Sequence, residues 1–348
     1  MAKRDIVVIG ASAGGVQALK ELAAALPSDF NASIFVVLHV SPHSPSYLPE
    51  ILNHSGSLKA SHPKDGESIR PGHIYVAPPD HHLLVEYDQV IVKKGPKENR
   101  FRPSIDALFR SAAYSYGSRV IGVVLTGLLD DGTSGMWSVK RLGGVGIIQK
   151  PDDALYPNMP DSVLQHVDVD YQVPITELAP LLCQLINETV PDKHSNLDVD
   201  MDRMETEVNI AAQVNAFEMG ILNLGDLTPL TCPECNGALV SIKEGKLIRY
   251  RCHTGHSYTA STLLADVTTT VEESFWKAVR SLEEAVILLE QSARQFAEGG
   301  NEAAAHQFSQ KALETRERAA KTRNFIFQQE KISEDMAVNG LAAPQHTQ

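Results

Sequence analysis

The chain has 348 residues, of which 43% are hydrophobic and 21% are charged. This length allows two or three folding units, and this composition is typical of a globular protein rather than a disordered one. The net charge of −12 argues against a general nucleic-acid binder, because such a protein needs a basic face.

The N-terminal segment leads into only five apolar residues, which is too short for a signal sequence and is typical of a strand. No apolar run in the chain is long enough to cross a bilayer. We therefore expect a cytoplasmic protein without membrane insertion.

Residues 1–190 alternate β-rich runs with helical patterns, which predicts an α/β fold with a doubly wound, mostly parallel, Rossmann-like sheet. Two of the runs flank Asp88 and Gln89 and indicate a hairpin added to the parallel core. The expected strands are 6–10, 34–39, 74–77, 83–87, 90–93, 120–126 and 145–149. The expected helices are 15–25, 104–116 and 131–142, with Ser104 as the N-cap of the second.

Apolar periodicity is lost beyond residue 190, and we interpret residues 191–225 as a linker. A small metal-binding unit is expected at 226–262, a helical hairpin at 263–335 and a disordered tail at 336–348. The first hairpin helix carries a heptad-like apolar stripe, which comprises Val271, Phe275, Ala278, Leu282, Ala285 and Leu289.

The turn Gly10–Gly15 follows the first strand and opens the first helix. It fits the G-x-S-x-G pattern of an exposed serine, and it could also hold a phosphate on backbone N–H groups. The middle glycine of the dinucleotide fingerprint is replaced by Ser12, and the next strand ends in His39 instead of an acidic residue.

Ser12, His39 and Asp131 each follow a predicted parallel strand, so all three should lie at one edge of the sheet. A serine nucleophile needs a base, and the base needs a carboxylate that fixes its tautomer. Each residue also has a simpler explanation: Ser12 and Asp130 or Asp131 as helix caps, and His39 as a core histidine. The sequence pattern alone leaves both interpretations open.

Six segments, in order, carry a family resemblance: VVIGASAGG, VVLHVSP, YVAPPDHHL, RPSIDALFRSAA, GVVLTGLLDDGTSG and YPNMPDSVL. Over residues 4 to about 185 the chain resembles the catalytic domain of chemotaxis-type protein-glutamate methylesterases, the CheB family. The resemblance implies a triad of Ser12, His39 and Asp131. Asp131 is preferred to Asp130 because it directly precedes the glycine of T-G-x-x-x-D-G.

The implied reaction is hydrolysis of glutamate γ-methyl esters on a methylated chemoreceptor or receptor-like protein, with glutamine deamidation as a side activity. A methyltransferase or another signalling protein is an expected further partner.

Backbone N–H groups near Ala13 and Leu128 are candidate oxyanion donors. Pro42, Met159 and Pro160 are expected on loops that line the cleft, and His43, His81 and His82 on the surface. The receiver domain of typical members is expected to be absent, and the C-terminal extension could replace its control.

Three cysteines and a histidine in the extension have the spacing of a zinc knuckle: Cys232, Cys235, Cys252 and His256. Four protein ligands close the coordination sphere, so we expect a structural Zn²⁺ and no catalytic cofactor. His253 competes with His256 as the fourth ligand, and free cysteines in a small core are the alternative. Cys183 lies in an apolar helix and is expected to pack in the core.

Two other functions remain open. The Gly10–Gly15 turn could bind a nucleotide in a scaffold module without esterase activity, or the triad could serve a peptidase or amidase. The helical stripe could mediate self-association or docking to a partner.

Overall fold

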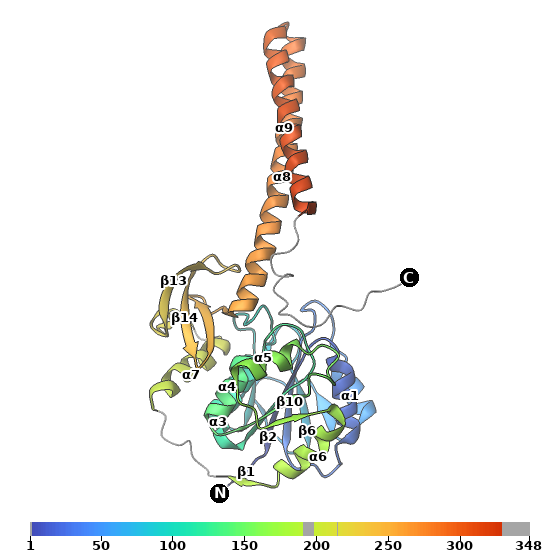
Figure 1. Cartoon of the computed structure of the whole chain (residues 1–348), viewed down its shortest axis with the longest axis vertical. Helices are drawn as coiled ribbons and strands as arrows, with labels where there is room; N and C mark the ends of the chain where they lie inside the picture. The colour runs from blue at the N-terminus through green and yellow to red at the C-terminus, as the bar shows by residue number, and fades with distance from the viewer. Residues whose placement is uncertain (1, 191–197, 214, 329–348) are drawn as a thin grey trace. The chain divides into compact units, whose positions relative to one another are not determined.

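The structure is a computed structural model that describes residues 2–190, 198–213 and 215–328 (Figure 1). It contains two compact units, Met1–Leu263 and Leu264–Gln348. The predicted tail at 336–348 lies outside the described residues. None of the described helices combines the length and the apolar character that a bilayer-spanning segment needs.

A seven-stranded parallel sheet forms the centre of the first unit. Its order is β11-β10-β9-β2-β3-β6-β4, and every neighbouring pair is parallel. The strands are β2 (Ile6–Ala11), β3 (Ser33–Leu38), β4 (Lys59–Ser61), β6 (His73–Val76), β9 (Val120–Val124), β10 (Val145–Gln149) and β11 (Tyr171–Val173). The predicted α/β fold with a parallel sheet is confirmed.

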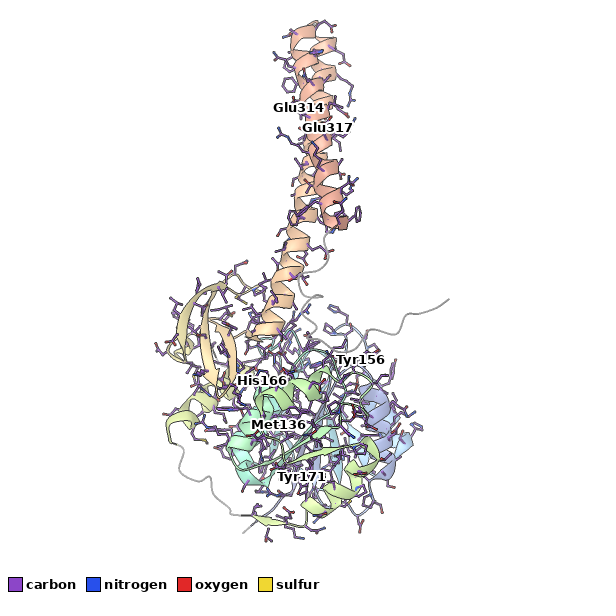
Figure 2. All side chains as sticks on the ribbon, viewed as in Figure 1. Met136, Tyr156, His166, Tyr171, Glu314 and Glu317 are labelled. Carbon is purple, nitrogen blue, oxygen red and sulfur yellow. The ribbon has the colours of Figure 1, made fainter. Side chains whose placement is uncertain are left out.

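Helices cover both faces of this sheet because successive strand residues point to opposite sides. Val7 and Ile9 pack towards α1 (Gly15–Ala25), α2 (Leu48–Ser55) and α6 (Ile175–Leu185). The other face holds α3 (Ile105–Tyr116), α4 (Thr133–Arg141) and α5 (Asn158–His166). Figure 2 labels Met136 on α4, whose side chain is fully buried in this second layer.

The predicted hairpin is present as β7 (His82–Glu86) and β8 (Gln89–Lys93), but it does not join the parallel sheet. It forms a separate antiparallel sheet with β5 (Glu67–Ser68). Two serine hydroxyls of α3 bind the backbone of the edge strand β7. Ser111 Oγ accepts from Val85 N at 3.1 Å, and Ser115 Oγ donates to Val85 O at 3.0 Å. The hairpin is therefore held by a helix rather than by a parallel neighbour.

The predicted linker contains a helix, α7 (Asp198–Ala211), and a 3₁₀ turn at Ile221–Asn223. Met204 and Val208 of α7 are buried, and so is the carboxylate of Glu207, which pairs with Arg249 at 2.7 Å. Because an ion-paired glutamate occupies a core position, the apolar periodicity that signals a helix is broken there. Residues 191–197 and 214 lie outside the described part, and the predicted domain boundaries stay predictions.

Residues 226–262 are called the extension from here on. They contain a four-stranded antiparallel sheet of β13 (Asp226–Thr231), β14 (Ala238–Glu244), β15 (Leu247–Cys252) and β16 (Ser257–Thr259). It belongs to the same compact unit as the parallel sheet. A buried ion pair at 2.7 Å joins Arg251 of β15 to Glu98, which lies in the loop before α3. Short strands complete the first unit: β1 (Ala2–Lys3) pairs with β12 (Thr189–Val190).

Helices α8 (Ala260–Glu298) and α9 (Glu302–Gln328) form an antiparallel helical hairpin, as predicted, and the second unit comprises α9 and all of α8 from Leu264 onward. Phe296 stacks on Phe308, and Phe275 meets Phe325 further from the turn. The predicted stripe is shifted by one residue in places, because Val279 and Val286 are buried whereas Ala278 is exposed. Glu314 and Glu317, labelled in Figure 2, are exposed on α9.

Candidate active site and metal site

Ser12, His39 and Asp131 follow three neighbouring strands at the carboxyl edge of the parallel sheet. Ser12 follows β2, His39 follows β3, and Asp131 comes after β9. Strand β2 lies between β3 and β9, so the chain leaves it towards one side of the sheet and later returns on the other. Such a switch point leaves a crevice in which open α/β sheets place their ligands.

The three side chains form one hydrogen-bonded line. His39 Nδ1 lies 3.2 Å from Ser12 Oγ, and His39 Nε2 lies 2.8 Å from Asp131 Oδ2. An ionised carboxylate only accepts, so Nε2 carries the ring proton and Nδ1 is left to accept the serine hydroxyl. The imidazole is 4% exposed and the carboxylate is fully buried, so water competes little for these bonds.

Asp131 is held by the first turn of α3. Its carboxylate accepts from the backbone N–H groups of Ile105, at 2.7 Å, and Asp106, at 3.2 Å. Ser104 Oγ donates to it at 2.9 Å, so the predicted N-cap binds Asp131 and makes no cap bond of its own. Burial disfavours the charge of Asp131, but the bonds from His39 and these other donors outweigh it and lower its pKa.

Asp106 performs the reciprocal role for α4. Its Oδ1 accepts from the backbone N–H groups of Gly132 and Gly135, at 3.0 and 2.6 Å. Asp131, just before α4, thus caps α3, and Asp106, in the first turn of α3, caps the start of α4, so the two helix starts are held together. Burial, together with the charge of Asp131, raises the pKa of Asp106 well above its ordinary value.

Asp130 points away from this line, although it is adjacent in sequence to Asp131. Its Oδ2 accepts a hydrogen bond from Ser261 in the first turn of α8. Burial raises the pKa of Asp130, and the Ser261 bond opposes that rise only in part. The carboxylate that bonds to His39 is therefore that of Asp131 and not that of Asp130.

Two residues of the loop before α3 were not singled out from the sequence. Phe101 stacks on the imidazole of His39, with ring centroids 3.7 Å apart and planes 8° apart. Asn99 donates from Nδ2 to Asp131 Oδ1 at 2.9 Å. Neither residue has a motif of its own, so only the fold brings them to the site.

Gly127 lies against Ser12. A Cβ at this position would lie 2.1 Å from Met159 Sδ and 2.8 Å from Ser12 Cβ, so only glycine fits. Met159 and Pro160, expected on loops, belong to α5, and Met159 is fully buried. Both side chains are on the buried side of α5, and this burial explains why the segment is a helix and not an open loop.

His82, expected on the surface, is fully buried. Its Nε2 lies 2.8 Å from the carbonyl oxygen of Pro96, and its Nδ1 accepts from the backbone N–H of Ser104 at 3.3 Å. Both ring nitrogens are satisfied, which makes burial of this neutral imidazole tolerable. The histidine supports the loop before α3 rather than binding a metal.

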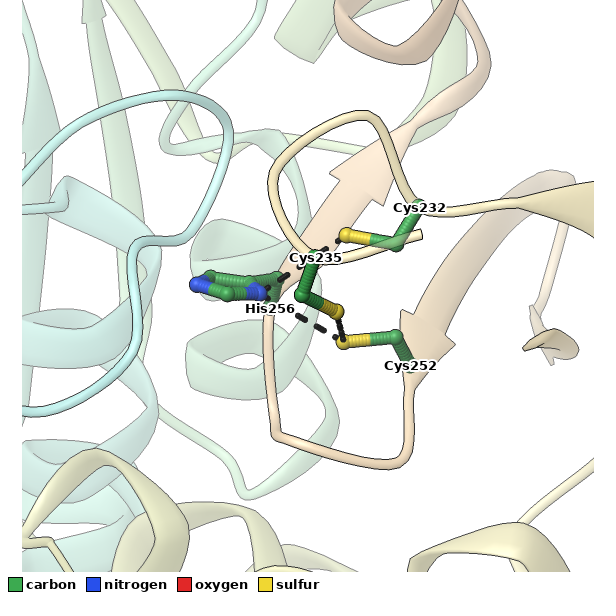
Figure 3. Close-up of side chains that lie close together, drawn as sticks. All are labelled: Cys232, Cys235, Cys252 and His256. Carbon is green, nitrogen blue, oxygen red and sulfur yellow. Dashed lines mark hydrogen bonds between the residues drawn. The ribbon is translucent and has the colours of Figure 1, made fainter. Parts of the chain in front are cut away.

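The four predicted metal ligands converge in the extension (Figure 3). Cys235 Sγ and Cys252 Sγ are 3.6 Å apart, and His256 Nδ1 lies 3.7 Å from Cys232 Sγ and 3.5 Å from Cys252 Sγ. The four ligand atoms all lie within 4.8 Å of one another, and His256, not His253, is the histidine among them. Residues that could hold a metal are therefore assembled in a closed group.

Cys183 lies in α6 and packs against the core.

A family model described as CheB methylesterase matches residues 7–182, about half of the chain. The chain belongs to the CheB methylesterase family. The match contains Ser12, His39 and Asp131 and ends before the extension.

Known CheB relatives are similar to this first half. A relative from Leptospira interrogans (strain Fiocruz L1-130) is 37% identical over 182 residues, which cover 52% of this chain and 94% of the relative. The protein-glutamate methylesterase/protein-glutamine glutaminase of Thermotoga maritima is 35% identical over 185 residues, or 52% of this chain and 54% of that protein. The chain thus spans about half the length of the Thermotoga relative.

A solved structure has the same fold. The crystal structure of the Thermotoga maritima CheB methylesterase catalytic domain superposes with a TM-score of 0.51 at 35% sequence identity. It covers 53% of this chain and 100% of that domain.

Proposed function

We propose that the chain hydrolyses γ-methyl esters of glutamate on methylated chemoreceptor-type proteins, with Ser12 as the nucleophile, His39 as the base and Asp131 as its orienting carboxylate. The observation that carries this proposal is the continuous line from Ser12 Oγ through His39 to Asp131. Membership of the CheB methylesterase family supports the choice of a methyl ester as substrate.

The geometry supports a two-step reaction. Ser12 Oγ attacks the ester carbonyl carbon while its proton passes to His39 Nδ1, and that proton then leaves with the departing methoxide as methanol. Water next attacks the acyl-serine while His39 takes one of its protons, and His39 then returns that proton to Ser12 Oγ as the acyl bond breaks, which leaves a free Ser12 and a glutamate side chain. A glutamine side chain would follow the same path with ammonia as the leaving group.

Backbone N–H groups would stabilise the oxyanion of each tetrahedral intermediate. The N–H of Ser12 already donates to Thr126 O at 3.0 Å, and that of Gly127 to Tyr156 O at 2.9 Å. Neither is available to a substrate. The N–H groups of Ala13 and Leu128 remain our proposed donors.

Acylation of Ser12 can be tested with an activated ester such as p-nitrophenyl acetate. Wild-type protein should release a burst of about one p-nitrophenol per chain, and Ser12→Ala should release none, because the nucleophile is lost. Methanol release from a methylated receptor measures the physiological reaction. Full activity in Ser12→Ala would disprove the triad, and thermal stabilisation by a nucleotide would favour the scaffold function instead.

We also propose that Cys232, Cys235, Cys252 and His256 bind a structural Zn²⁺. A tetrahedral site with Zn–S bonds of about 2.3 Å separates neighbouring sulfur atoms by about 3.8 Å. The separation of 3.6 Å between Cys235 Sγ and Cys252 Sγ is close to this value, and all four ligand atoms lie within 4.8 Å of one another. Bound there, the metal would hold the turn before β14 to the turn between β15 and β16.

The metal proposal predicts one Zn²⁺ per chain in native mass spectrometry. Cys252→Ser should lose the metal and lower the melting temperature of the first unit, because a small sheet depends on such a link. Cys183→Ser is the matched control and should keep the metal. A Cys252→Ser protein with unchanged metal content would contradict the assignment.

A further inference from the structure

The loop between β8 and α3, residues 95–103, is bound along its length by the extension. Asn99 N donates to Ser257 O at 2.8 Å, and Ser257 N donates to Lys97 O at 3.2 Å. The loop thus continues the extension sheet beyond β16. The buried pair of Glu98 and Arg251, at 2.7 Å, fixes the same contact with charge. All these residues belong to the first compact unit.

The side chain of Asn99 joins the extension to the carboxylate of Asp131. On one side, Asn99 Nδ2 donates to Asp131 Oδ1 at 2.9 Å and to Asp106 Oδ2 at 2.7 Å. On the other side, Asn99 Oδ1 accepts from Thr259 N at 3.1 Å and lies 3.4 Å from Thr262 Oγ1. Asn99 is 1% exposed, and both ends of its amide are used.

Thr259 and Thr262 are themselves fixed by reciprocal capping of α8. Thr262 N donates to Thr259 Oγ1 at 3.2 Å, and Thr259 N lies 2.9 Å from Thr262 Oγ1. This arrangement is a capping box with threonine in the place of the usual glutamate. It holds the Thr259 N–H towards Asn99. Ser261, between the two threonines, binds Asp130.

The same loop also sets the plane of the imidazole, because Phe101 stacks on His39 at 3.7 Å. One short segment therefore places both the carboxylate and the base of the proposed triad. Its conformation includes Asn99 and Arg100 at positive φ, 51° and 76°, which costs free energy and needs outside support. The extension supplies backbone and side-chain bonds to this strained segment.

We infer that residues 257–262 of the extension complete the active site, by holding the loop so that Asn99 orients Asp131 and Phe101 orients His39. Asn99 and Thr262 are then positioning residues. This inference rests on the proposed function of Ser12. Small displacements of a catalytic base from its nucleophile can reduce turnover by up to about 100-fold.

The test uses the full chain with Thr262→Val, which keeps the shape of the side chain and removes its hydroxyl. We expect kcat for p-nitrophenyl acetate to fall about 10- to 100-fold with KM changed less than about twofold, because positioning acts on chemistry rather than on binding. Thr262→Ser restores the hydroxyl and should restore kcat. Thr268→Val is the matched control on α8, since its hydroxyl bonds to Leu264 O of the same helix, at 2.8 Å.

The possible outcomes separate this inference from the proposed function. Wild-type kcat in a folded Thr262→Val protein, with Ser12→Ala inactive, overturns the inference alone. Wild-type activity in Ser12→Ala overturns the proposed function. If near-ultraviolet circular dichroism shows that Thr262→Val is not folded, Phe101→Leu takes its place, because Phe101 is half-buried and its ring stacks on His39. It should lower kcat about threefold, and an unchanged kcat would also overturn the inference.

Discussion

Asp130 and Asp131 are neighbours in the sequence, yet their carboxylates have different partners. Asp131 accepts hydrogen bonds from His39 Nε2 and from the backbone N–H of Ile105 at the start of α3, and its pKa is lowered. Asp130 accepts a hydrogen bond from Ser261 Oγ, and burial raises the pKa of Asp130. Residue type alone cannot separate them, because both would cap a following helix equally well. Their roles follow from the direction in which each side chain leaves the turn after β9.

Asparagine at each position in turn tests this difference. Asp131→Asn should lower kcat by about 10⁴-fold, because an amide offers His39 Nε2 a donor and destabilises the tautomer that accepts from Ser12. Asp130→Asn should lower it by no more than a few-fold. Steady-state kinetics on a methylated receptor or an activated ester measures both. Equal losses in the two variants would contradict the assignment of Asp131.

At the scale of elements, the site depends on how two helices and one loop exchange contacts. Asp131 caps α3 and Asp106 caps α4, so neither helix start can move without the other. The loop before α3 is held in turn by β16 and the start of α8. These contacts connect residues that are up to 163 positions apart, as between Asn99 and Thr262. Local propensity carries no information about such pairs.

At the scale of the molecule, buried ion pairs make the extension part of the first unit. Arg110 of α3 lies 3.1 Å from Glu98 and 3.5 Å from Glu207 of α7, and Arg251 and Arg249 of β15 bind the same two glutamates. Burial disfavours these charges, but the arginines outweigh it and lower the pKa of Glu98 to about 2. Removing everything after residue 190 would take Arg251 from Glu98 and Glu207 from Arg110, and each broken buried pair costs about 3–5 kcal/mol.

We therefore predict that a chain ending at residue 190 does not fold. The lost pairs are comparable with the whole stability of a typical domain, about 5–15 kcal/mol. A chain ending at residue 270 retains all of the first unit and should show a cooperative urea transition. Glu98→Gln with Arg110→Met in the shorter chain removes the two buried charges that lost partners beyond residue 190 and should recover some soluble protein. A wild-type chain of residues 1–190 with a cooperative transition would show that the extension is dispensable for folding.

The α/β class, the parallel strands and the sheet edge shared by Ser12, His39 and Asp131 could be predicted from the order of residues. These features follow from local periodicity and from the rule that parallel strands share a carboxyl edge. The spacing of Cys232, Cys235, Cys252 and His256 likewise indicated the metal cluster, because its turns are short and local.

The contacts between the extension and the site could not be predicted in this way. The helix α7 was hidden because Glu207 and its arginine partners occupy core positions, so the usual apolar pattern is missing. Asn99 and Phe101 carry no signal of their own, since each acts only through a partner distant in sequence or across the fold. Charge pairing and long-range hydrogen bonds depend on which segments the fold brings together, and the order of residues along the chain does not record this.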